Sequence, residues 1–345
     1  LGEILFERLS LESNPKKTKT GQYSTSEDTL SKLAKKHEIA KLILEWRSLQ
    51  KLLTTYVYSL PKQIDPNSNK IHTEFNQTLT TTGRLSSINP NLQNIPIRTE
   101  RGKLIRKSFI PSDESYTLLC ADYSQIELRI IAFLSGDSNM KNAFINNEDI
   151  HTSTAARVFN ININEVNEEQ RRNAKIVNFG IIYGVSAFGL SNQTNLTRGE
   201  SKEIIDNYFK SYPKLKEYMR NQISYARENG YVETILKRKR YLPEINSRNA
   251  ILRSSAERNA INTPVQGSAA DIIKLAMIKI DSEIEKKSLK SKLILQVHDE
   301  LVFDVHLPEL NIVKEIVSYN MENAIQIDVP LKVDIGYGDN WLVAH

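Results

Sequence analysis

The stretch Leu118-Leu-Cys-Ala-Asp-Tyr-Ser124 is the part of the sequence that decides the fold. It lies at the end of a short apolar run, Tyr116 to Cys120, which is typical of a buried strand. A helical pattern follows directly, from Gln125 to Leu134, and Gly136 ends it. We therefore expect Asp122 at the end of a rigid strand, where its carboxylate can be partly exposed.

A second aspartate has a comparable setting much further along the chain. Leu293 to Val297 and Leu301 to Val305 are strand-like runs joined by His298-Asp299-Glu300, which predicts a hairpin with an acidic tip. Two charges 4 Å apart repel by about 4 kcal/mol at an effective dielectric constant of 20, so a site that unites Asp122 and Asp299 needs a cation. A pair of Mg²⁺ ions removes this cost and creates a phosphoryl-transfer centre. The alternative is that each aspartate merely ends a strand in solvent, and sequence spacing does not decide between the two.

A third feature is a helix with cations and aromatic rings along one face. The motif Asn167-x-x-Gln170 resembles a capping box, which predicts a helix start. Four residues follow at steps of four and form one stripe: Arg171, Lys175, Phe179 and Tyr183. Cations suit a triphosphate and aromatic rings suit a base that stacks on them. The alternative is a helix with solvated basic residues and a buried Phe and Tyr.

Other local patterns make structural predictions of their own. The Ser-x-x-Glu motifs at 24–27 and 124–127 each fit a capping box that opens a helix. Lys41 to Tyr58 has apolar residues at helical spacing. Asn262 to Asp271 opens a helix, but Pro264 makes a continuous helix there doubtful.

Length, charge and cysteine content define the broad class. A chain of 345 residues is long enough for two or three domains with a real core. The net charge of +5 permits a polyanionic partner without requiring one. The single cysteine, Cys120, excludes an internal disulfide framework and favours a reducing compartment. The coarse order is helical, mixed, helical and mixed, which favours α+β, and the start at Leu1 suggests a piece of a longer chain.

Five segments together resemble the polymerase region of family A DNA polymerases, the DNA polymerase I type. They occur in the family's order and at similar separations, and they are Thr82–Ser87 with Pro90–Pro96, Asp122–Arg129, Arg171–Gly180 with Tyr183-Gly184, Asn262–Asp271 and Val297–Glu300. The resemblance runs from Leu1 to Gly338-Asp-Asn-Trp341. It implies an α+β right-hand polymerase fold with an antiparallel-sheet palm, helical fingers and a partial helical thumb. The implied domains are a partial thumb (1–61), the first part of the palm (62–134), the fingers (135–235) and the second part of the palm (236–345).

The resemblance also implies roles for the matching residues. Asp122 and Asp299 would hold two Mg²⁺ ions with the Tyr123 carbonyl as a further ligand, and Lys175 would protonate the leaving group. The implied catalytic residues are thus Asp122, Asp299 and Lys175. Glu127 would crowd the 2′ position of the sugar and exclude ribonucleotides. The implied nucleotide-binding residues are Gln125, Glu127, His151, Arg171, Lys175, Phe179 and Tyr183. The implied DNA-binding residues are Arg84, Asn91, Gln93, Arg258, Asn262, Gln266 and His298.

The implied function is an enzyme, a template-directed DNA polymerase that adds deoxynucleotides to a primer 3′-hydroxyl in replication or repair and releases pyrophosphate. Its expected partners are primer–template DNA and deoxynucleoside triphosphates, with no membrane, and we expect a monomer. The expected compartment is the cytoplasm of a bacterial-type cell, or an organelle if a targeting segment lies upstream. One rival is a single-subunit RNA polymerase, against which Glu127 argues because a bulky acid would clash with a 2′-hydroxyl. The other is a catalytically inactive DNA-binding module, against which the complete set of acids argues.

Overall fold

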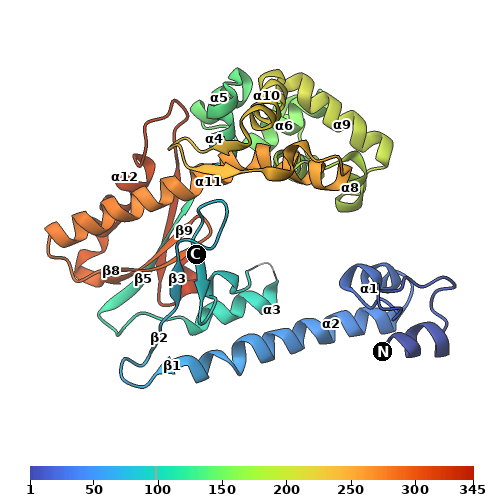
Figure 1. The fold of residues 1–345 in the computed structure, drawn as a ribbon. Coiled ribbons are helices and arrows are strands. Elements are labelled where there is room, and N and C mark those ends of the chain that lie inside the picture. The colour runs from blue at the N-terminus through green and yellow to red at the C-terminus, as the bar shows by residue number, and fades with distance from the viewer. Residues whose placement is uncertain (98) are drawn as a thin grey trace. The chain divides into compact units, whose positions relative to one another are not determined.

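The computed structural model describes residues 1–97 and 99–345, which form two compact units. Unit 1 comprises residues 1–74 and 95–105, and unit 2 comprises residues 75–94 and 106–345. Figure 1 shows the helices and strands, coloured from blue at the N-terminus to red at the C-terminus. None of the helices in the described ranges combines the length and apolar character needed to span a membrane.

Unit 1 is mainly helical. Its elements are α1 (Glu27–Ala34), α2 (Glu38–Leu52), β1 (Ile64–Asp65), β2 (Lys70–Ile71) and α3 (Glu100–Lys103). The helix predicted over 41–58 is present, because α2 continues into a π-helical turn over Leu53–Val57. The capping box predicted at 24–27 is wrong. Ser26 stands directly before α1, so its side chain, and not that of Ser24, accepts a hydrogen bond from the N–H of Thr29.

A four-stranded antiparallel sheet lies at the centre of unit 2, in the order β10-β5-β9-β8. The strands are β5 (Tyr116–Tyr123), β8 (Lys292–Val297), β9 (Glu300–His306) and β10 (Val333–Gly338). The predicted strand therefore continues through Tyr123, and the predicted hairpin around residues 298–299 is confirmed. In register, Asp122 lies opposite Glu300 on β9 and opposite Asp334 on β10.

Helices cover both faces of the sheet, so its apolar side chains are buried. The hydroxyl of Tyr123 donates to the carbonyl of Met321 on α12 (Leu310–Glu322). The indole of Trp341, on α13 (Trp341–Ala344), donates to Glu300. Because side chains alternate along a strand, Asp122 and Glu300 share the face that α13 covers, whereas Tyr123 is on the α12 face.

The remaining helices of unit 2 form the helical body at the top of Figure 1, together with the start of α11. They are α4 (Ile126–Ser135), α5 (Ser138–Ile145), α6 (Ile150–Phe159), α7 (Glu168–Ile182), α8 (Ala187–Gln193), α9 (Arg198–Ser211) and α10 (Pro213–Asn229). Two short ribbons complete the fold, β3 (Glu74–Asn76) with β4 (Ser86–Ile88) and β6 (Tyr231–Glu233) with β7 (Lys239–Tyr241).

The long helix α11 corrects one prediction. It runs without a break from Ala250 to Lys286 with Pro264 inside it, so the doubt about a continuous helix was wrong. An interior proline costs a helix about 3 kcal/mol or more, because it removes one hydrogen bond and crowds the preceding turn. Here Pro264 and its neighbours Thr263 and Val265 are buried, and this packing offsets the cost. The Ser268 hydroxyl adds a contact one turn further on, where it donates to the carbonyl of Pro264.

Candidate active site

The two predicted aspartates come together at one end of the sheet. The N–H of Tyr123 donates to the carbonyl of Asp299 over 3.2 Å, which joins the end of β5 to the turn between β8 and β9. That turn is tight, because His298 has a positive φ of 55°. The backbone thus places Asp122 and Asp299, which are distant in the sequence, beside each other.

The electrostatics of the pair favour a bound cation. Burial, and then the charges of Asp299 and Glu300, raise the pKa of Asp122 to about 6. Burial also raises the pKa of Asp299, although the positive charge of Arg84 opposes this. Among the described residues, no hydrogen-bond donor neutralises either carboxylate. Carboxylate oxygens are the ligands that Mg²⁺ prefers, so the pair fits a hard divalent ion.

Glu300 is the third acid at this end of the sheet, and its carboxylate is already bound by other side chains. Its carboxylate accepts from the Trp341 indole over 3.1 Å and lies 3.0 Å from Nδ1 of His345. Arg106 lies 3.5 Å from its other oxygen. Burial alone would raise the pKa of Glu300, but His345 and Trp341 lower it overall. Because Trp341, His345 and Arg106 engage its oxygens, Glu300 is a weaker candidate ligand than the two aspartates.

Glu127 is the centre of a buried polar network beside the aspartates. Its side chain is buried, and Arg84 donates to Oε1 over 2.7 Å while the Tyr183 hydroxyl donates to Oε2 over 2.5 Å. Burial and Glu127 raise the pKa of Tyr183, and the side chain of Gln266 opposes this rise, so Gln266 belongs to the same network. Burial raises the pKa of Glu127, whereas Tyr183 and Arg84 oppose the rise and Asp299 adds to it. The network thus links four of the predicted site residues.

This network explains why the capping box predicted at 124–127 is wrong. The residue before α4 is Gln125, which has a left-handed conformation and makes no side-chain capping hydrogen bond. The Glu127 carboxylate is turned toward Arg84 and Tyr183 and so does not reach back to Ser124. The side chain of Gln125 is half-buried, and its Oε1 has no hydrogen-bond partner among the residues that the structure describes.

Helix α7 presents most of the predicted stripe to one cavity. The capping box at its start is confirmed, because the side chains of Asn167 and Gln170 each accept a hydrogen bond from the backbone N–H of the other. A cavity of about 480 Å³ is lined by Lys175, Phe179 and Tyr183 from the stripe. It is also lined by residues that the sequence reasoning did not single out for it: Arg172, Ile176, Gly180, Val185 and Gln193. Arg171 is not in the lining, because its guanidinium pairs with Asp149, with Nε 2.9 Å from Oδ2.

His151 lies beneath this helix. Only 2% of its surface is exposed, its Nδ1 is 3.0 Å from Nδ2 of Asn178, and its ring centroid is 5.8 Å from that of Phe179. Burial, opposed by Asp149 and assisted by Lys175 and Arg171, lowers its pKa to about 4. The imidazole is therefore neutral at pH 7 in this arrangement.

The shifted pKa of His151 predicts a pH dependence. The unfolded chain takes up this proton near pH 6.5 and the folded chain only near pH 4, so the stability contributed by neutral His151 is complete above pH 6.5 and falls as the pH drops toward 4. Proton NMR titration of the imidazole, assigned with a His151→Asn variant, should give a pKa near 4. A midpoint at the ordinary value of histidine would contradict the burial.

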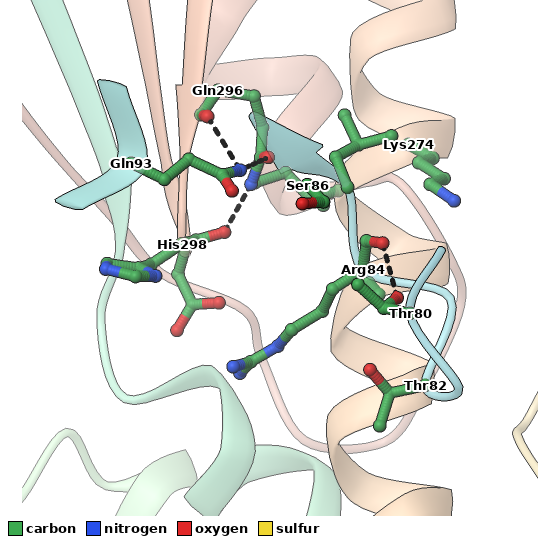
Figure 2. A pocket seen from close by; sticks show the side chains of 12 residues that line it. Thr80, Thr82, Arg84, Ser86, Gln93, Lys274, Gln296 and His298 are labelled. Atoms are coloured by element: carbon green, nitrogen blue, oxygen red, sulfur yellow. Dashed lines mark hydrogen bonds between the residues drawn. The ribbon is translucent and has the colours of Figure 1, made fainter. Parts of the chain in front are cut away.

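The predicted DNA-binding residues are divided between two places. A second cavity, of about 210 Å³, is lined by Arg84, Gln93, His298 and Asp299 (Figure 2). Its wall also includes Thr82, Leu85, Ser86 and Ala270, which belong to the motif segments but were given no role. The other lining residues lie outside the motifs: Thr80, Ile273, Lys274 and Gln296. The Gln93 amide donates to both the backbone and the side-chain oxygen of Gln296, at 3.2 and 3.0 Å.

The other predicted DNA-binding residues lie outside the lining of this cavity. Asn91 is exposed and accepts from the N–H of Gln93 over 3.0 Å. Arg258 and Asn262 are on α11, as is Gln266. Arg258 is exposed and donates to Ser254 over 3.0 Å. Oδ1 of Asn262 is buried and has no hydrogen-bond partner within residues 1–97 and 99–345.

The basic run Lys237-Arg-Lys-Arg240 begins in the turn between β6 and β7 and continues into β7, and it is largely engaged within the protein. Arg238 pairs with Asp271, with a shortest distance of 2.7 Å, and Arg240 donates to the Thr263 hydroxyl over 2.8 Å. Lys239 lies 4.2 Å from the ring centroid of Tyr231. The run of residues 237–240 is therefore only in part a solvated surface.

Comparison with known proteins identifies close relatives. The sequence model of DNA polymerase family A matches residues 1–343. DNA polymerase I of Bacillus subtilis (strain 168) is 52% identical over 341 residues, which are 99% of this chain and 38% of the relative. DNA polymerase I of Caldicellulosiruptor bescii is 53% identical over 341 residues, which are 99% of this chain and 40% of the relative.

A solved structure is similar over nearly the whole chain. It is described as the POL domain of Pol1 from M. smegmatis in complex with DNA primer-template and dNTP, and the TM-score is 0.92 at 45% sequence identity. The match covers 99% of this chain and 60% of that one. The present chain thus spans about two fifths of the curated relatives' length.

Proposed function

Because the chain belongs to DNA polymerase family A, we propose that it adds deoxynucleotides to a primer 3′-hydroxyl on a DNA template and releases pyrophosphate. The predicted family and the predicted α+β right-hand fold are both confirmed by the comparisons. The observation that carries the proposed function is the meeting of Asp122 and Asp299 at the end of β5. The two half-buried carboxylates repel each other when they lie side by side, and bound cations remove this cost.

In this proposal Asp122 and Asp299 hold two Mg²⁺ ions, with the carbonyl of Tyr123 as a further ligand. Two ions bound there would lower the pKa of the primer 3′-hydroxyl and neutralise the triphosphate and the leaving pyrophosphate. A divalent metal requirement is general in the family. The rigid end of β5 and the tight turn at His298 hold the two carboxylates in place before substrate arrives.

The nucleotide would bind along α7. Lys175 lines the cavity with an exposed side chain, which suits contact with the phosphates and transfer of a proton to the leaving group. Phe179 and Tyr183 are further along the same wall, where a sugar and base could pack. Arg171 would have to leave Asp149 to bind phosphate, and His151 would have to become exposed, so both roles imply a rearrangement of α7 and α6.

The primer–template duplex would lie against Arg84, Gln93 and His298, with Asn91, Arg258, Asn262 and Gln266 assisting. In the minor groove every base pair offers an N3 or O2 acceptor, so donors such as Arg84 and Gln266 can check pair shape without reading sequence. Residues 62–134 and 236–345 would form the palm, 135–235 the fingers and 1–61 part of the thumb. We further propose that the protein is a monomer. It would act in the cytoplasm of a bacterial-type cell, in replication or repair.

Primer extension tests the function. We expect extension of an annealed primer with four deoxynucleotides, little with ribonucleotides, and DNA affinity that falls steeply with salt because lysines and arginines displace counterions. Equal use of ribonucleotides would favour an RNA polymerase. Salt-dependent binding without extension under all metal conditions would favour an inactive DNA-binding module.

A further inference from the structure

The turn that carries Arg84 is fastened to α11 by contacts that the proposed reaction does not use. The ammonium group of Lys274 donates to the carbonyl of Gly83 over 2.6 Å. The Thr80 hydroxyl closes the turn by donating to the carbonyl of Arg84 over 2.5 Å (Figure 2). A Cβ added at Gly267 would lie 3.1 Å from the carbonyl oxygen of Thr82, so the turn and the helix are in close contact.

An ion pair between the buried Asp271 and the partly exposed Arg238 closes the other side of the same turn. Asp271 is 4% exposed and accepts from Nε of Arg238 over 2.8 Å and from the Thr234 hydroxyl over 2.7 Å. Gly83 has a φ of +81°, and a Cβ added there would lie 2.6 Å from Nε of Arg238. The side chain of Arg238 therefore lies over Gly83 and leaves the turn little room to move.

The three anchoring positions belong to one face of α11. Gly267, Asp271 and Lys274 are four and three residues apart, so they lie above one another on the helix. The turn that they hold presents Arg84 to Glu127 at 2.7 Å. A shift of the turn would therefore move Arg84 and disturb the buried network of Glu127 and Tyr183.

We propose that Lys274 is a positioning residue for Arg84: its hydrogen bond to Gly83 holds the turn so that the Arg84 guanidinium reaches both Glu127 and the minor groove of the terminal base pair. This inference rests on the proposed polymerase function. Without the ammonium group, the Gly83 carbonyl loses its charged donor and the turn can shift. A displacement of about 1 Å at a positioning group can cost on the order of 100-fold in rate.

Primer extension with a minor-groove analogue tests the proposal. A primer ending in 3-deazaguanine lacks the N3 acceptor that Arg84 would contact, so the unaltered protein should extend it more slowly than a guanine primer, and Arg84→Ala should not distinguish the two. Lys274→Met should lower kcat/KM on the guanine primer about tenfold, the scale of one charge-assisted hydrogen bond. It should also reduce the discrimination between the two primers, and the double variant should be no slower than Arg84→Ala alone.

Two variants control for charge and folding. Lys274→Arg keeps a donor and should recover part of the discrimination. Lys279→Met removes a lysine of the same helix that also donates to carbonyl groups, those of Asn323 and Ala324 at 3.1 and 3.0 Å, and should leave extension unchanged. Thermal denaturation of each variant shows whether it is folded.

Independent action of Lys274 would overturn the proposal. If the effects of Lys274→Met and Arg84→Ala multiply, and discrimination between the primers is unchanged, Lys274 does not act through Arg84. Absence of extension by the unaltered protein would instead overturn the proposed function, and the positioning role with it.

Discussion

Replacing Asp122 or Asp299 by alanine is expected to abolish primer extension, with a loss on the order of 1,000-fold or more in kcat. The reason is that each carboxylate would contribute a ligand to the ions that stabilise the transition state by several kcal/mol, and each 1.36 kcal/mol is tenfold in rate. Single-turnover extension under saturating deoxynucleotide measures this loss. DNA binding, measured by fluorescence anisotropy in the presence of Ca²⁺ or without metal, should be largely retained because most of its energy comes from phosphate contacts.

The chain offers a matched control for the loss of negative charge. Asp334 is an exposed aspartate directly opposite Asp122 in the sheet, and its charge also raises the pKa of Asp122. Asp334→Asn should change extension only a few-fold, whereas Asp122→Asn, which keeps the shape of the side chain, should be nearly as inactive as Asp122→Ala. Normal turnover of either Asp122 or Asp299 variants would remove the ligand roles. Equal losses at residues 122 and 334 would show that charge, and not ligation, matters.

Replacing Glu127 by alanine is expected to admit ribonucleotides, with relative ribonucleotide use raised on the order of 100-fold. The side chain is held rigidly by Arg84 and Tyr183, so it cannot easily move away from a 2′-hydroxyl. Misfit in a rigid pocket typically discriminates 10- to 200-fold per small group. Competition between a deoxynucleotide and the matching ribonucleotide at a single template position measures the ratio. Deoxynucleotide incorporation should also slow, because the alanine variant leaves Arg84 and the Tyr183 hydroxyl without their acceptor.

The variant Tyr183→Phe tests whether sugar selectivity depends on the size of the Glu127 side chain or on the orientation of its carboxylate. It removes the hydroxyl that donates to Oε2 of Glu127 and leaves the carboxylate and its Arg84 contact in place. If the bulk of Glu127 excludes the 2′-hydroxyl, this variant should lose much less selectivity than Glu127→Ala. Unchanged sugar selectivity in the alanine variant would dismiss the gate role. Equal loss in both variants would assign selectivity to the orientation of the carboxylate.

Local patterns along the chain correctly predicted the elements that they encode. The apolar run before Asp122, the helix after it and its end at Gly136 follow from hydrogen bonding and periodicity among near neighbours. The capping box at Asn167 is of the same kind, since both partners lie within one turn. Matching motifs in a fixed order identified the family for the same reason: they are stretches of consecutive residues.

Two local patterns failed because of contacts with distant parts of the chain, whereas the capping box at 24–27 failed because the neighbouring Ser26 caps α1. Ser124 and Glu127 have capping-box spacing, but Arg84 and Tyr183 bind the Glu127 carboxylate. Pro264 predicts a break, yet burial on all sides carries α11 through it. In both of these cases a long-range contact outweighed a local preference of a few kcal/mol or less.

The sequence by itself determined the strand that carries Asp122, the hairpin around Asp299, the helix that carries Lys175 and Phe179, and the family. Only the tertiary structure decided that the two aspartates meet, that Glu300 is turned to Trp341 and His345, and that Lys274 fastens the turn of Arg84. The physical reason is that spacing along the chain encodes contacts between neighbours. Sheet register, burial and the pairing of charges depend on segments that folding alone brings together.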